Sequence, residues 1–204
     1  MSAGKVAPPI PNRLELPLGD GKLLRVDFDR SGDRWRHRLL LVLPEGSDVV
    51  GPVLLLESLE GNSQEDWPVS PPLQFVSIET RPKKLPIALL IGMAGGSHWS
   101  ASIEQDPATR TVRFDIACRA KSRPENLGSR YRIAPRVELQ SGTEAVSLHF
   151  AAGGLTFEIA GETGKDSPQP TVRTADNELG IHFSEPTNDQ PQTYRWMYRL
   201  TATQ

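Results

Sequence analysis

The sequence has little cysteine and no long apolar run. Cys118 is the only cysteine among the 204 residues, which excludes an intramolecular disulfide and a cysteine-based zinc site. No segment approaches the about 20 apolar residues that a membrane-spanning helix needs. Residues 1–12 contain three prolines and no apolar stretch typical of a secretion signal. We therefore expect a cytoplasmic protein without a membrane partner, although a mature secreted chain with a new initiator methionine would share these features.

An excess of charge of one sign is also lacking. The chain has 23 Lys and Arg against 25 Asp and Glu, a formal net charge of −2. No basic run is long enough to follow a phosphate backbone, and the pair Lys83-Lys84 lies in a proline-rich stretch typical of a solvated loop. These features exclude nucleic acid as an expected partner.

Proline, by contrast, is abundant, with 18 of 204 residues. Because proline interrupts helices and central strands, its frequency indicates many strand ends and shaped loops. Between the turn signals, apolar residues alternate in short runs without helical periodicity. We predict a flexible N-terminal arm over 1–12 and one all-β domain over 13–204. The expected fold is an antiparallel β-sandwich of jelly-roll type, with a closed antiparallel β-barrel as the alternative.

Alternation and turn signals place several strands. The segment 35–43 is the longest early strand, and 87–93 is apolar on both faces, which predicts a central strand covered on both sides. In the stretch 59–72, Asn62 or Ser63 is placed to cap a single helical turn. The expected core comprises Trp35, Leu39, Leu41, Leu89, Ile91, Trp99, Ile103, Phe114, Ile116, Phe150, Phe157, Ile181 and Phe183.

The clearest hairpin joins the segments 98–104 and 112–119. Residues 106–109 read Asp-Pro-Ala-Thr, which fits a type I turn. Pairing Asp106 with Thr109 puts Ile103 opposite Val112, so turn and hydrophobic pattern agree. The inward face of this hairpin includes Cys118, which we interpret as inert packing.

The other face of the hairpin carries the candidate binding residues. Hydroxyl, carboxylate and guanidinium groups on a concave sheet can bind a sugar or another polar small molecule. The expected anchor is an arginine whose rigid fork donates two hydrogen bonds. The alternative is a solvated face with cross-strand ion pairs, such as Arg113 with Glu104. The candidates are His98, Ser100, Ser102, Arg113 (the anchor), Asp115 and Arg119, with Trp67 from a neighbouring loop as an exposed contact or as a lid over the sheet end.

No catalytic or metal motif is found. In the proposed register Glu104 and Asp115 lie about 13 Å apart along the strands, too far for a glycosidase pair. Residues 93–97 contain two glycines after an apolar strand, but the helix that a phosphate loop needs does not follow. The histidines have no metal-binding spacing. We therefore predict no catalytic residue, no metal and no cofactor.

Aromatic residues alternate on one face of the last strand, at Tyr194, Trp196 and Tyr198. Such a stripe predicts a core, with a sugar-stacking platform as the alternative. The segments HWSASIEQD and TVRFDIACR resemble a hairpin of carbohydrate-binding β-sandwiches, in which a W-x-S strand precedes an F-D-x-A strand. The resemblance covers this hairpin alone and implies no functional residue.

The function that these patterns favour is non-catalytic binding of a polar small molecule or carbohydrate. A structural or protein-interaction subunit, such as a homodimer joined along a sheet face, is the alternative. An enzyme with a site assembled from loops is a third interpretation. A concave polar sheet face would favour the first, an exposed apolar patch the second, and a deep pocket with converging His and carboxylate groups the third.

Overall fold

The computed structural model describes residues 12–141, 145–150, 155–164, 167–183 and 191–203, with the backbone alone for 138–141 and 145–150. These ranges contain fifteen strands and no helix. The first sheet has the order β1-β2-β3-β4-β9-β14-β13 and the second the order β10-β11-β12-β15-β8-β7-β6-β5. The strands of the first sheet are β1 (Arg13–Gly19), β2 (Lys22–Ser31), β3 (Arg34–Val42), β4 (Val53–Ser58), β9 (Gly128–Ile133), β13 (Thr171–Ala175) and β14 (Glu178–His182). Those of the second are β5 (Leu73–Arg81), β6 (Lys84–Ala94), β7 (Ser97–Asp106), β8 (Thr111–Ala120), β10 (Val137–Ser141), β11 (Ala145–Phe150), β12 (Leu155–Glu162) and β15 (Gln192–Thr203).

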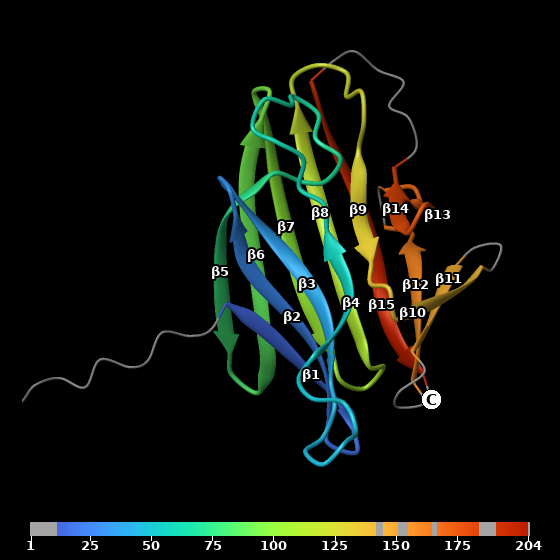
Figure 1. Ribbon diagram of the computed structural model, residues 1–204. Coiled ribbons are helices and arrows are strands. Elements are labelled where there is room, and N and C mark those ends of the chain that lie inside the picture. The colour runs from blue at the N-terminus through green and yellow to red at the C-terminus, as the bar shows by residue number, and fades with distance from the viewer. Residues whose placement is uncertain (1–11, 142–144, 151–154, 165–166, 184–190, 204) are drawn as a thin grey trace, which may run out of the picture.

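The two antiparallel sheets pack face to face, with the blue strands β1–β3 lying across the green strands β5–β8 (Figure 1). Each sheet ends in edge strands, so the predicted sandwich is confirmed and the closed barrel is excluded. Consecutive strands are mostly neighbours, and the sandwich is therefore built from hairpin meanders rather than from jelly-roll connections. The last strand, β15, is an exception because it lies between β8 and β12 in the middle of its sheet.

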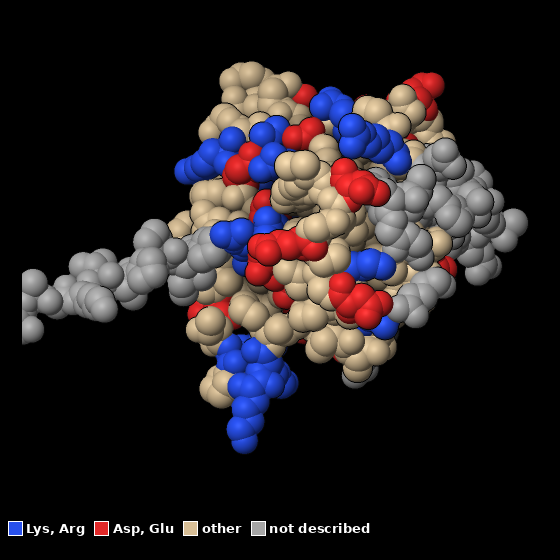
Figure 2. Space-filling view, turned by 60° about the horizontal axis from the view of Figure 1, so that its bottom comes forward, with Lys and Arg blue, Asp and Glu red and all other residues tan. Residues whose placement is uncertain are grey.

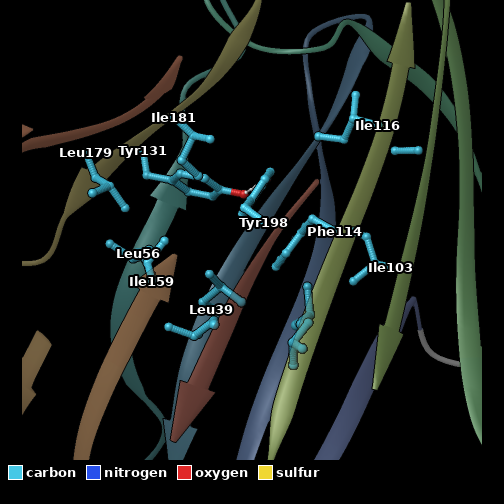
Figure 3. Close-up of a cluster of buried hydrophobic side chains, with 14 of the residues drawn as sticks. Leu39, Leu56, Ile103, Phe114, Ile116, Tyr131, Ile159, Leu179, Ile181 and Tyr198 are labelled. Carbon is cyan, nitrogen blue, oxygen red and sulfur yellow. Dashed lines mark hydrogen bonds between the residues drawn. The ribbon is translucent and has the colours of Figure 1, made fainter. Parts of the chain in front are cut away.

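The core fills the space between the sheets (Figure 3). The stripe on β15 is buried, as the core interpretation predicts, and the ring of Tyr198 stacks on Phe114 with centroids 4.7 Å apart. Most of the predicted core is confirmed. The buried members are Leu39, Leu41, Trp99, Ile103, Phe114, Ile116, Phe157 and Ile181; the side chain of Phe150 lies outside the described residues.

Four predicted core residues are not fully buried. Trp35 and Phe183 are half-buried at the margins of the core, where Trp35 also lies under the Arg30 guanidinium. Leu89 and Ile91 are exposed, because β6 is covered on its inner face only. The doubly apolar pattern of 87–93 was wrong as an indicator of burial on both sides.

The β7–β8 register differs from the predicted one by two residues. Asp106 pairs with Thr111 and Ile103 with Phe114. The turn is therefore a longer loop, in which the Asp106 carboxylate accepts hydrogen bonds from the Ala108 backbone N–H and the Thr109 hydroxyl. Because side chains alternate with a period of two, a shift of two residues keeps every side chain on its predicted face.

The stretch 59–72 forms turns rather than the expected helical turn. Asn62 still caps locally, since its side-chain oxygen accepts a hydrogen bond from the Gln64 N–H at 2.9 Å. Trp67 in this stretch is half-buried and meets Trp99 edge-on, with ring centroids 6.4 Å apart. The loop therefore covers the end of the core, with Trp67 as its lid.

Candidate functional site

A shallow trough runs along the outer face of the eight-stranded sheet, across β6, β7 and β8. Two hollows of about 500 Å³ and about 470 Å³ form it, and they share Ile91, Ser100 and Ala117. Ser100 and Ala117 lie opposite each other in the β7–β8 register. Their small side chains form the floor of the trough, because larger residues flank them on both sides.

One side of the trough is apolar. This apolar wall consists of Phe75 on β5 and of Leu89, Ile91 and Met93 on β6, with exposed fractions of 59%, 42%, 57% and 48%. The three β6 residues alternate along the strand and therefore project from the same, outer face. Sequence reasoning missed this wall, although its signal was present as apolar residues on both faces of 87–93.

The other side of the trough is polar. His98 lies opposite Arg119, and Ser102 lies opposite Asp115. Arg195 on β15 holds Asp115 through two hydrogen bonds, one from Nε to Oδ1 at 2.7 Å and a second from Nη2 to Oδ2. The trough thus combines an apolar wall with hydroxyl, carboxylate and guanidinium groups, which is the composition of small-molecule sites in general.

The structure brings most of the predicted binding residues together. His98, Ser100 and Arg119 line the first hollow, and Ser102 and Asp115 line the second. These five residues therefore share one face of the sheet and lie in a depression rather than on a convex surface, and their role in binding stays a prediction.

Two predicted residues lie elsewhere. Arg113 belongs to a separate hollow of about 450 Å³, where its Nε donates to Glu162 at 2.6 Å. The Arg113 guanidinium is thus paired with a carboxylate from β12, and the sequence alone could not predict that β12 lies near Arg113. Trp67 packs on Trp99, whose side chain faces the core, so Trp67 does not cover the trough.

The spacing argument against a glycosidase pair does not hold. In the observed register Glu104 lies opposite Arg113, only two residues from Asp115, or about 7 Å along the strand. Each carboxylate is nevertheless occupied by an arginine, Asp115 by Arg195 and Glu104 by Arg81 at 3.8 Å. The two carboxylates line different hollows of the sheet face.

A second group of polar side chains is buried between the sheets, under the 59–72 loop. The imidazole Nε2 of His37 lies 2.7 Å from the Tyr131 hydroxyl, which lies 2.6 Å from the Tyr198 hydroxyl (Figure 3 shows the two tyrosines). The Ser58 hydroxyl accepts from the His37 backbone N–H at 2.8 Å and donates to the Glu60 carboxylate. Sequence alone could not place these residues together, because they come from β3, β4, β9, β15 and a loop.

Burial dominates the titration of this cluster. It lowers the pKa of His37 to about 4 and raises the pKa of Glu60 to about 7, although the Ser58 hydrogen bond and the nearby Arg34 partly oppose the second shift. The associated cavity measures about 10 Å³, room for about one water molecule. A substrate does not fit there, so the loop-assembled enzyme site is not supported by this cluster.

The remaining candidate motifs have structural roles. Gly95 and Gly96 form the two-residue β6–β7 turn, with φ values of 51° and 76° as such a turn requires. Cys118 is buried, as expected. In the described part of the chain, no three His, Cys, Asp or Glu side chains are grouped to hold a metal ion.

The surface charge is mixed. Figure 2 shows basic and acidic side chains interspersed over the face that carries the strand turns. Among the described residues no helix is long and apolar enough to cross a membrane.

Comparison with known proteins adds little. No protein-family model matches the chain, and no curated protein matches it. One similar solved structure is described as "Putative kojibiose phosphorylase from human microbiome", with a TM-score of 0.40 and 9% sequence identity. The match covers 95% of this chain and 33% of that chain, so this chain spans about a third of the length of that protein.

Proposed function

We propose that the protein is a non-catalytic binding domain for a carbohydrate or a similar polar small molecule, held in the trough on the eight-stranded sheet. The observation that carries this proposal is the pairing of an apolar wall with a polar wall across a floor of small residues. A sugar ring has the same duality, because its C–H groups are apolar and its hydroxyls are donors and acceptors. Phe75 and Ile91 supply apolar contact, and Asp115, Arg119 and the floor hydroxyl of Ser100 supply hydrogen bonds.

The test is a glycan and metabolite screen by NMR titration, with the trough blocked in a matched variant. Ala117→Leu fills the floor, and Ala175→Leu makes the same change at an exposed position of β13 in the other sheet. A ligand of the trough should shift resonances of β6–β8 in the wild type and in Ala175→Leu, but not in Ala117→Leu. Binding that survives Ala117→Leu would place the site elsewhere, and a screen without hits would remove the proposal.

The apolar wall also favours a second candidate, a homodimer joined along this face. Four large apolar side chains exposed on two adjacent strands at the edge of a sheet are typical of an interaction surface. In that case sedimentation velocity should show a dimer that Ile91→Asp converts to a monomer. A wild-type chain that stays monomeric would contradict this function.

A further inference from the structure

The ionisable side chains in the first hollow are all basic. Its lining contains His98 and Arg119 and no carboxylate. The other hollows of the same sheet face differ, since one contains the pair Asp115 and Arg195 and another contains several glutamates with Arg113. We call the first hollow the Arg119 hollow. An anionic ligand bound there would not be repelled by a carboxylate of the lining, as it would be in the other two hollows.

Arg119 also differs from the other arginines of this face. Arg81, Arg113, Arg195 and Arg199 each lie within 4 Å of a carboxylate. Arg119 is exposed and forms no hydrogen bond or ion pair with the residues that the structure describes. A guanidinium left without a carboxylate keeps its planar fork of donors for an external anion.

One neutral polar group of the hollow, the Gln74 side chain, also offers hydrogen-bond donors. The side-chain oxygen of Gln74 accepts a hydrogen bond from the Met93 backbone N–H at 3.0 Å. This contact orients the amide and leaves its NH₂ group as the free end. This group on β5 and the Arg119 guanidinium on β8 both favour a ligand that presents acceptor oxygens.

We propose that the ligand of the trough is anionic, an acidic sugar of the uronic-acid class whose carboxylate binds Arg119 while its ring lies against Phe75, Ile91 and Met93. This inference rests on the proposed binding function and specifies the ligand class. The β6 side of the trough spans five residues from Leu89 to Met93, and the four steps between them measure about 13 Å at about 3.3 Å per residue. Such a length accommodates a short oligosaccharide rather than one ring alone.

The test compares two probes of the same shape by isothermal titration calorimetry, digalacturonate and its uncharged dimethyl ester. The wild type should bind the acid, and its preference over the ester should weaken as ionic strength rises. Arg119→Gln should reduce affinity for the acid about tenfold or more, because a charge-assisted hydrogen-bond pair is lost. It should leave affinity for the ester nearly unchanged.

Arg173→Gln is the matched control, since Arg173 is exposed on β13 of the other sheet and the substitution changes net charge equally. Equal losses of affinity in the two variants would show a general charge effect and overturn the role of Arg119. Equal binding of acid and ester would overturn the anionic ligand while leaving the trough as a sugar site. Failure of both probes, together with a screen without hits, would remove the proposed function itself.

Discussion

His37 and Glu60 lie in one buried cluster, and burial shifts their pKa values in opposite directions. The folded state holds Glu60 protonated between pH 4.5 and about 7, where the unfolded chain has released the proton. Between pH values of about 4 and 6.5 the folded state holds His37 neutral, whereas the unfolded chain carries it protonated. Their contributions to the pH dependence of stability therefore oppose each other over most of this range.

Glu60→Gln should make the protein more stable at alkaline pH. The stability that protonated Glu60 contributes is present below pH 4.5 and is lost as pH rises through about 7. A pKa shift of this size corresponds to a difference of about 3 kcal/mol in the free energy of unfolding. Glutamine stays neutral, so urea unfolding should find the variant more stable than the wild type by up to about 3 kcal/mol at pH 8 and similar to it at pH 4. A wild type as stable as the variant at pH 8 would contradict the burial of this carboxyl.

His37→Asn should reveal the pH dependence of stability that comes from Glu60, because in the wild type the opposite contribution of His37 cancels most of it. The stability from neutral His37 is present above pH 6.5 and is lost as pH falls through about 4. Without it, the contribution of Glu60 acts alone, and the free energy of unfolding should decrease from pH 4.5 to 7. Urea titrations at several pH values measure this slope, and a variant with the same flat profile as the wild type would refute the opposition of the two groups.

Phe114→Ala tests the core between the sheets. Phe114 is 1% exposed and stacks on Tyr198, so the truncation removes burial and leaves a cavity. We expect a loss of about 3–5 kcal/mol in denaturant unfolding. The control is Phe75→Ala, in which a phenylalanine that is 59% exposed is removed, and its effect should stay below about 1 kcal/mol. Comparable losses would mean that Phe114 does not lie in the core.

At the level of elements, the strand pattern could be predicted from sequence because alternation with a period of two survives an error of register. The polar hairpin face was identified although Asp106 pairs with Thr111 rather than Thr109. What could not be predicted depends on partners distant in the chain. Arg113 binds Glu162 from β12, and the outer face of β6 has no covering element in the described structure. A pattern of apolar residues indicates which side chains favour burial, but it does not indicate whether another part of the chain or a ligand buries them.

The β6–β7 turn and the 59–72 loop are packed together, and glycine substitutions measure this contact. A Cβ on Gly95 would lie 2.6 Å from the Cβ of Asp66, whereas a Cβ on Gly32 would meet nothing within 4 Å. Both glycines have positive φ, so each alanine substitution carries a similar backbone strain of about 1–2 kcal/mol. Gly95→Ala should therefore destabilise the protein more than Gly32→Ala in thermal unfolding. Equal losses of stability in the two variants would show that the 59–72 loop shifts away from the added methyl group without a free-energy cost.

At the scale of the whole molecule, the order of strands predicts how protection from hydrogen exchange is distributed. The last strand of the chain, β15, pairs with β8 on one side and β12 on the other, while β5 and β13 each have one neighbour. The eight-stranded sheet can therefore be completed only when the end of the chain is in place.

Amides of β8 and β15 should exchange only through global unfolding, with free energies of exchange equal to the free energy of unfolding measured in urea. Amides at the free edges of β5 and β13 need only local opening, and they should exchange at least about tenfold faster, a difference of 1.4 kcal/mol or more. Hydrogen exchange followed by NMR at pH 7 resolves the strands. If β15 exchanged as fast as β5, the C-terminal strand would open independently, and the aromatic stripe that it carries would not be the centre of the cooperative core.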